Sequence, residues 1–184
     1  MGSEMCIRDR TDTGAVQDQG LRFAPYSADG EVVERVDPNR YVGLWYEIAT
    51  SGSFQQTQCA GTTATYTPLD EDTIEVLNRC YLGSLDGPLN EIVGSATAID
   101  DTFSRLLVDF GFGFEAPYDI VELDGTALDA PYAFAAVSSL GGAQIWILSR
   151  TPQLDAEVYD ALVERLDARG LDPDRLVLTD QPTE

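Results

Sequence analysis

Hydrophobic and polar residues alternate in short segments along most of the chain. In one of these segments Ile74 and Val76 alternate with Thr73 and Glu75, the period of two that is typical of a half-buried strand. Similar segments follow one another after Asp37, separated by turn residues. Eight of them precede any helical pattern, at residues 43–50, 61–68, 73–82, 90–99, 103–110, 118–123, 132–138 and 144–148. The pattern therefore predicts a mainly β protein.

The connections between these segments are short and rich in Gly and Asp, as in LDGPL, IDDTF and SLGGA. Connections of this length join antiparallel neighbours and leave no room for helical crossovers. Such spacing is typical of a sandwich or an up-and-down barrel. Eight antiparallel strands close into a barrel that holds one small ligand, provided that inward side chains do not fill it.

One helical pattern follows the eighth strand. Its apolar positions lie four apart, at Leu154, Val158, Leu162 and Leu166. These positions share one helix face, which we expect to pack on the outside of the sheet. Thr151 is expected to cap this helix, with Pro152 in its first turn and Gly170 at its end. A last short strand is predicted at residues 175–179.

The first 35 residues lack this pattern. Residues 1–10, MGSEMCIRDR, resemble no signal peptide, and we interpret them as a remnant of cloning or gene prediction. Residues 11–35 are expected to form an extended, partly mobile leader. The domain is then expected to span residues 36–181, with a tail at 182–184. Cys6 does not follow the small apolar residues that precede a lipid-anchored cysteine, so no anchor is predicted from it.

Composition and charge narrow the possible partners. Hydrophobic residues make up 43% of the 184 residues, yet no apolar run is long enough to span a bilayer. The chain carries 32 acidic and 11 basic residues, for a formal net charge of −21. Such a charge repels phosphate backbones and anionic lipid surfaces, so no nucleic-acid partner is expected.

The chain contains no histidine. This excludes Ser-His-Asp and Cys-His catalysis and histidine-ligated zinc. The three cysteines form no CxxC pair, and neither a metal nor a cofactor is expected. Cys59 and Cys80 flank a predicted hairpin turn at residues 69–72. A disulfide between them is favoured over two free buried thiols, and it would suit an exported protein.

The stretch RYVGLWYEIA, at residues 40–49, has a glycine two positions before a tryptophan. Gly43 would let the chain enter the first strand tightly, and Trp45 would then close one end of the barrel. Arg150 ends the last barrel strand, in QIWILSRTP. Since the first and last strands become neighbours on closure, we expect its guanidinium to stack on the indole ring.

The elements GLWYEIA, ILSRTP, LDAEVYDALVERL and DRLVLT together resemble the bacterial lipocalins related to apolipoprotein D, from Val36 to Gln181. The resemblance implies an all-β fold: an eight-stranded antiparallel up-and-down barrel with one C-terminal α-helix packed outside. It also implies binding and transport or storage of a fatty acid, a lysophospholipid or a similar lipophilic molecule. The resemblance further implies a location in the periplasm or at the outer membrane. The sequence does not decide between these two places, nor between a monomer and a homodimer.

Aromatic residues near the predicted strand ends are the candidates for ligand contacts: Tyr66, Phe110, Phe112, Phe114, Tyr118 and Trp146. Core packing explains each of them singly, because alternation does not say which strand face points inward. The stretch DFGFGFEAP, at residues 109–117, predicts either an apolar lip at the barrel mouth or a bulged hairpin.

Two other functions remain open beside binding. An enzyme on this scaffold would need paired carboxylates inside the barrel, such as Glu47 and Asp109, although Glu47 alone is expected to be structural or at the surface. A filled barrel would serve as an interaction module. Small residues in the strands favour an open interior and hence a binding protein rather than an enzyme: Gly94, Ala96, Ala98, Ala133, Ala135 and Ala136.

Overall fold

The computed structural model describes residues 20–52, 58–126 and 129–183. The strands are β1 (Gly43–Thr50), β2 (Cys59–Pro68), β3 (Thr73–Leu82), β4 (Leu89–Ala98), β5 (Arg105–Asp109), β6 (Glu115–Leu123), β7 (Phe134–Ser139), β8 (Gln144–Ser149) and β9 (Val177–Leu178). The helices are α1 (Pro38–Tyr41) and α2 (Ala156–Ala168), with short 3-10 turns η2 (Leu140–Gly142) and η3 (Pro173–Arg175). The strand bounds lie within three residues of the predicted ones.

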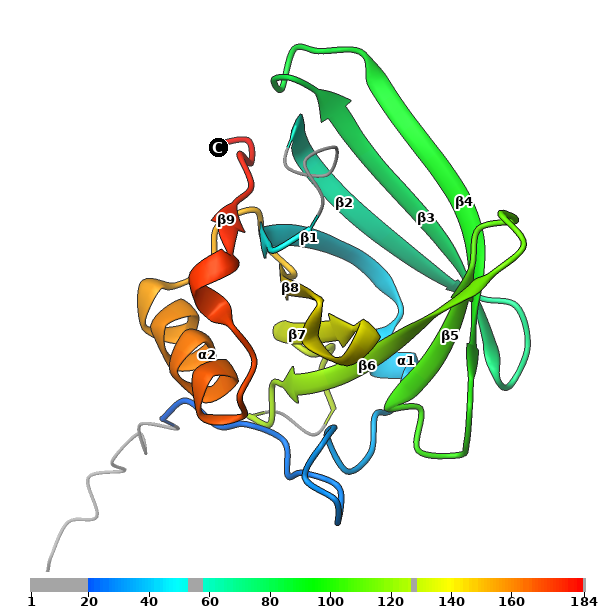
Figure 1. The fold of residues 1–184 in the computed structure, drawn as a ribbon, viewed down its shortest axis with the longest axis vertical. Coiled ribbons are helices and arrows are strands. Elements are labelled where there is room, and N and C mark those ends of the chain that lie inside the picture. The colour runs from blue at the N-terminus through cyan, green and yellow to red at the C-terminus, as the bar shows by residue number, and fades with distance from the viewer. Residues whose placement is uncertain (1–19, 53–57, 127–128, 184) are drawn as a thin grey trace, which may run out of the picture.

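Strands β1 to β8 form a closed antiparallel barrel (Figure 1). Each strand pairs with the next along the chain, and β1 pairs with both β2 and β8. This confirms the predicted eight-stranded up-and-down barrel. The closed end lies where α1 enters β1, and the open end lies where the β3–β4, β5–β6 and β7–β8 connections meet.

Strands β1 and β2 pair only toward the closed end, from Gly43 opposite Tyr66 to Tyr46 opposite Thr63. Farther along, β9 takes the place beside β1 (Figure 1). After β9, the backbone N–H of Gly61 in β2 donates to the carbonyl of Asp180 at 2.6 Å. The C-terminal segment therefore completes the barrel wall between β1 and β2 near the open end.

Helix α2 packs on the outside of the barrel, as predicted (Figure 1). Leu162 and Leu166 are fully buried against a cluster that includes Ile145 and Ile147 of β8. The helix continues to Ala168 because its apolar positions recur every four residues on the face that meets the sheet.

The predicted start of α2 is wrong. Asp155, not Thr151, is the N-cap, and its carboxylate accepts a hydrogen bond from the backbone N–H of Glu157 at 2.8 Å. The Thr151 hydroxyl instead donates to the carbonyl of Gln153 at 2.6 Å, so Thr151 and Pro152 form a turn before the helix. Aspartate and threonine both cap helices, so residue type alone does not distinguish Thr151 from Asp155.

Residues 20–35, part of the predicted leader, lie against β6. The backbone N–H of Val33 donates to the carbonyl of Ile120 at 3.0 Å, and Ala24 makes a similar bond to Leu123. Val32 and Val33 are buried. The described part of this segment is therefore held by the barrel, whereas residues 1–19, which include Cys6, lie outside the described residues. The domain boundary at residue 36 stays a prediction.

Within the described ranges, none of the helices has the length and apolar character required to cross a membrane.

Candidate functional site

Trp45 lies at the closed end of the barrel and is fully buried. Its indole N–H donates to the carbonyl of Tyr41 at 2.7 Å. The guanidinium carbon of Arg150 lies 3.8 Å from the centre of the indole ring. The same guanidinium donates to the carbonyls of Leu44, Arg40 and Tyr41. One cation thus ties α1 and β1 together across the end of the barrel.

Three tyrosine hydroxyls meet above this closed end. The Tyr118 hydroxyl lies 2.7 Å from that of Tyr41 and 2.8 Å from that of Tyr66. Burial raises the pKa of Tyr66 to about 12 and those of Tyr41 and Tyr118 well above their ordinary value, so all three remain protonated. Three protons serve two hydrogen bonds, and Tyr66 and Tyr118 both line the cavity. One hydroxyl proton of the three is therefore not used within the cluster.

Replacing Tyr118 by phenylalanine is expected to lower the free energy of unfolding by about 2 kcal/mol, because it leaves the buried Tyr41 and Tyr66 hydroxyls without their common partner. Urea unfolding measures the change. Tyr66→Phe is the matched control, since it removes one hydroxyl and one bond and should cost only about 1 kcal/mol. Equal losses in the two variants would show that Tyr118 does not hold the cluster together.

The barrel contains a cavity of about 300 Å³, bordered by residues from all eight strands. Its walls are mainly apolar, with side chains such as Ile74, Val76, Leu106 and Val108. Ligand sites in proteins are typically cavities of this kind, apolar with a few polar groups that orient the ligand. The interior is therefore not filled by protein side chains, in contrast to the interaction-module alternative.

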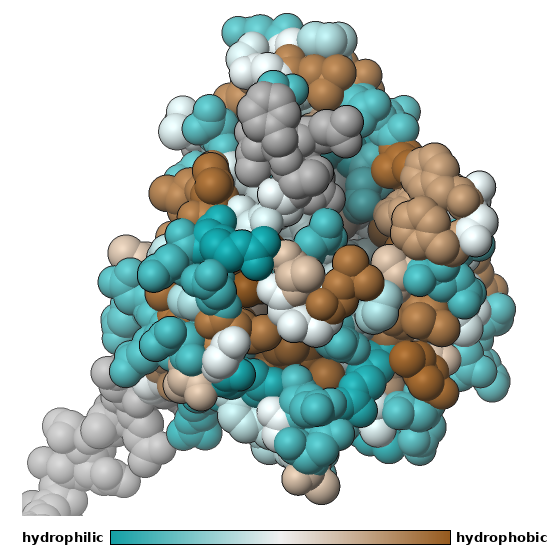
Figure 2. Space-filling model, viewed as in Figure 1, coloured by the Kyte–Doolittle hydropathy of each residue, from teal (hydrophilic) through white to brown (hydrophobic). Residues whose placement is uncertain are grey.

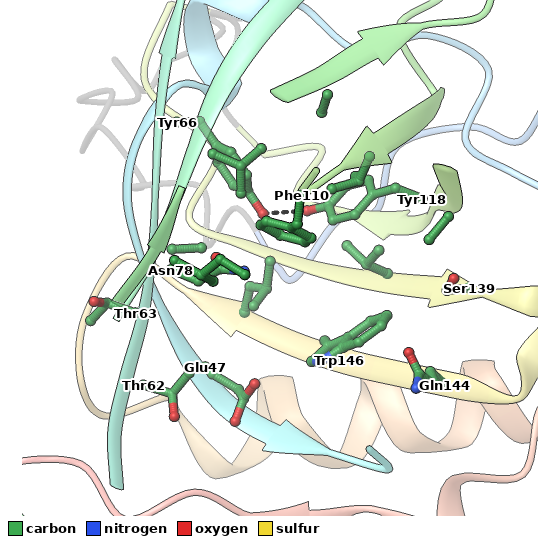
Figure 3. Close-up of a pocket in the computed structure, with 18 of the residues that line it drawn as sticks. Glu47, Thr62, Thr63, Tyr66, Asn78, Phe110, Tyr118, Ser139, Gln144 and Trp146 are labelled. Atoms are coloured by element: carbon green, nitrogen blue, oxygen red, sulfur yellow. Dashed lines mark hydrogen bonds between the residues drawn. The ribbon is translucent and has the colours of Figure 1, made fainter. Parts of the chain in front are cut away.

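The structure brings together four of the six predicted contact residues. Tyr66, Phe110, Tyr118 and Trp146 all border the cavity (Figure 3). Phe112 and Phe114 do not line it, and their exposed fractions are 68% and 66%. They lie in the connection between β5 and β6 at the open end, where Figure 2 shows apolar side chains at the surface. A ligand-binding role for any of the six stays a prediction.

Most of the small residues predicted to open the interior do something else. A Cβ atom at Gly94 would come within 2.4 Å of the Asp109 carbonyl oxygen and 2.6 Å of the Phe110 ring. Gly94 thus lets Phe110 pack against β4 and reach the cavity. Ala135 and Ala136 are fully buried in the core, and of the six small residues Ala96 alone lines the cavity.

Polar residues on the cavity wall were missed at the sequence level: Thr62, Asn78, Ser139 and Gln144. The alternation that begins at Ile74 and Val76 places Asn78 on the same strand face, so extending it by two residues would have found this side chain. The other three lie in or beside irregular strand ends, where a period of two gives no reliable face.

Glu47 is not at the surface, which was one of the two roles expected for it. Its side chain lines the cavity, and the residue is 7% exposed. The Thr179 hydroxyl donates to its Oε1 atom at 2.6 Å. Burial raises the pKa of the carboxyl group to about 7, although the bond from Thr179 opposes this rise. Figure 3 shows the carboxyl group directed into the cavity between Thr62 and Trp146.

Asp109, the proposed catalytic partner of Glu47, is not among the cavity-lining residues. Its carboxylate accepts the backbone N–H of Gly111 at 2.7 Å and so supports the β5–β6 turn. The structure therefore does not place these two carboxylates in one cavity.

The part of the chain that the structure describes also contains no cluster of three or more His, Cys, Asp or Glu residues that could hold a metal ion.

A disulfide joins Cys59 and Cys80 across β2 and β3, with 5.4 Å between their Cα atoms. The predicted pairing is confirmed. Both cysteines border the cavity near its open end. The bridge therefore fixes the two strands beside the place where β1 and β2 separate.

Comparison with known proteins agrees with this geometry. Residues 36–181 match the family model described as a lipocalin-like domain. The chain is 33% identical to the outer membrane lipoprotein Blc of Vibrio cholerae over 144 residues, which cover 78% of this chain and 81% of that protein. It is 31% identical to apolipoprotein D of Macaca fascicularis over 173 residues, which cover 91% and 88% of the two chains.

Solved structures show the same fold at lower identity. Insecticyanin from the tobacco hornworm Manduca sexta superposes with a TM-score of 0.63 at 20% identity, covering 89% of this chain and 90% of its own. Lobster apocrustacyanin A1 gives a TM-score of 0.63 at 20% identity, with coverages of 80% and 81%. Together with the matched domain and the relatives above 30% identity, these findings show that the chain belongs to the lipocalin family and is related to the bacterial Blc lipoproteins and apolipoprotein D.

Proposed function

We propose that the protein binds one lipophilic molecule of the fatty acid or lysophospholipid kind in its barrel and transports or stores it. The observation that carries this proposal is the apolar cavity of about 300 Å³ inside a closed barrel. Burial of each methylene of an acyl chain contributes about 0.8 kcal/mol, so chain length would supply most of the affinity. Tyr66, Phe110, Tyr118 and Trp146 would form the contact surface, and Phe112 and Phe114 would lie at the entrance.

Displacement of a fluorescent fatty acid tests the proposal, together with native mass spectrometry after incubation with a lipid extract. Val76→Phe places a larger side chain in the cavity and is expected to weaken binding at least about ten-fold. Val93→Phe is the matched control, since Val93 is 56% exposed on β4 and does not line the cavity. Retention of no apolar molecule, or equal binding by both variants, would contradict binding in the barrel.

The protein is further proposed to act by binding and not by catalysis. Glu47 is the one carboxylic acid in the described cavity lining, so this wall does not hold the carboxylate pair that the enzyme alternative calls for. The proposed location is the cell envelope, either in the periplasm or associated with the outer membrane. This location is proposed because relatives at 31–33% identity are named outer membrane lipoproteins. Cell fractionation with an antibody against the protein tests this location.

A further inference from the structure

Glu47 and Thr62 form a polar corner of the cavity, at the gap between β1 and β2 that the C-terminal segment fills. Glu47 of β1 and Thr62 of β2 lie next to each other in the cavity lining (Figure 3). Behind them, the Gln181 amide donates to the backbone carbonyls of both residues, each at 2.8 Å. The positions of the two side chains are thus fixed by the same short segment that carries Thr179, the partner of the Glu47 carboxyl group.

Hydrogen-bonding capacity in this corner is left unused. The Thr62 hydroxyl is completely buried and has no partner among the described residues, and the same holds for the side-chain oxygen of Gln181. One oxygen of the Glu47 carboxyl group accepts a hydrogen bond from Thr179, and the described residues provide no second hydrogen bond to this carboxyl group, which belongs to a residue that lines the cavity. Buried oxygen atoms with unused lone pairs favour a hydrogen-bond donor, and of these residues Glu47 and Thr62 line the cavity whereas Gln181 does not.

Charged side chains are few in the described cavity lining. Besides Glu47, the lining contains Arg79, whose guanidinium is paired with Glu91 at 2.5 Å, with half of its side chain exposed. The lining tyrosines remain neutral because burial raises their pKa values. Among the charged side chains that line the cavity in the described residues, ionised Glu47 is therefore the one without a charged partner. The whole chain carries a net charge of −21.

We propose that Glu47, assisted by Thr62, makes this cavity select a lipophile whose polar end is a protonated amine over one of equal length that ends in a carboxylate. An ammonium group brings three donors and no acceptor, which suits an ionised carboxylate beside an unpaired hydroxyl. A carboxylate brings only acceptors and a second negative charge into the same buried corner. The inference rests on the proposed function and narrows the ligand class for that cavity.

Competition between three ligands of equal chain length tests the inference. The assay measures displacement of the neutral fluorescent probe N-phenyl-1-naphthylamine by dodecylamine, dodecanol and dodecanoate. It is run at pH 8, where Glu47 is mostly ionised because its pKa is about 7. We expect dodecylamine to bind at least about ten-fold more tightly than dodecanoate, with dodecanol between them. Equal affinities of the amine and the carboxylate, with the probe and dodecanol bound, would overturn the inference and leave the proposed function standing.

Glu47→Gln keeps the size of the side chain and removes its charge. It should weaken dodecylamine at least about ten-fold, tighten dodecanoate, and change dodecanol by less than about three-fold. Asp160→Asn makes the same change in net charge on the exposed face of α2 and should leave all three affinities unchanged. If Asp160→Asn reproduces the effect of Glu47→Gln, the preference comes from the overall charge, and the assignment to Glu47 is wrong.

Thr62→Val gives a second, uncharged variant, which should weaken dodecylamine about three-fold and leave dodecanoate unchanged. Thermal melting of each variant checks that the barrel is intact before the affinities are compared. Failure of the wild-type protein to bind the probe or any of the three ligands would instead contradict the proposed function itself, and the inference with it.

Discussion

Replacing Trp45 by alanine is expected to lower the free energy of unfolding by about 3–5 kcal/mol, the range for truncation of a large aromatic residue in a core. The indole is fully buried, and its ring lies 5.2 Å from that of Tyr41, centre to centre. The substitution would also leave the Arg150 guanidinium, 3.8 Å from the indole centre, without its stacking surface. Urea unfolding followed by circular dichroism measures the loss.

Trp45→Phe is the control for this prediction. It keeps an aromatic ring at the closed end and removes the N–H that donates to the Tyr41 carbonyl, so it should cost markedly less than the alanine variant. An unfolding curve of Trp45→Ala that coincides with that of the wild type would show that Trp45 does not hold the closed end. A loss in Trp45→Phe as large as that in Trp45→Ala would assign the effect to the hydrogen bond.

The second large effect is a pH dependence of stability that comes from Glu47. The pKa of this carboxyl group rises from 4.5 in the unfolded chain to about 7 in the folded protein, because burial disfavours its charged form. The folded state therefore holds a proton that the unfolded state releases between these two values. Stability from this group is fully present below pH 4.5 and is lost as the pH rises through 7, by about 3 kcal/mol in total.

Glu47→Gln isolates this contribution, since every other titrating group is common to the two proteins. The free energy of unfolding of the variant minus that of the wild type should increase by about 3 kcal/mol between pH 4.5 and pH 8.5. Urea unfolding at several pH values measures the difference. A difference that stays constant with pH would mean that Glu47 titrates alike in the folded and unfolded chain, and a difference that falls would reverse the sign of the argument.

Ionisation of Glu47 is expected to have opposite effects on folding stability and on ligand binding. An ionised carboxylate buried in the barrel destabilises the fold, yet the same charge would attract a donor group of a ligand. A bound ammonium would supply the partner that the carboxylate lacks, so ligand binding and stability would be coupled at this residue. The hydrogen bonds from Thr179 and Gln181 hold the C-terminal segment beside it.

The strands and their antiparallel order were predictable from the sequence because they depend on local features. Alternation of Thr73, Ile74, Glu75 and Val76 marks a strand wherever it is placed. Short turns with Gly and Asp then force consecutive strands to be neighbours. Cys59 and Cys80 flank such a turn, so their pairing could also be predicted from the hairpin alone.

The capping of α2 shows where local reasoning is insufficient. Thr151 and Asp155 are both good caps, and the choice depends on where the chain leaves β8 and reaches the sheet surface. The same limit applied to residues 20–35, whose lack of a clear period suggested a leader although Val32 and Val33 are buried against the barrel. Burial against a distant strand leaves no periodic signal in such a short segment.

The sequence by itself determined the number of strands, their order, the helix and the residues that close one end of the barrel, because alternation, turns and spacing are properties of neighbouring residues. Only the tertiary structure decided which strand face points inward, and hence that Phe110 reaches the cavity while Phe112 and Phe114 do not. It also decided that the C-terminal segment enters the gap between β1 and β2 and buries Glu47. Thr179 and Gln181, which bond to Glu47, are more than a hundred positions away in the chain, so no local pattern records these contacts.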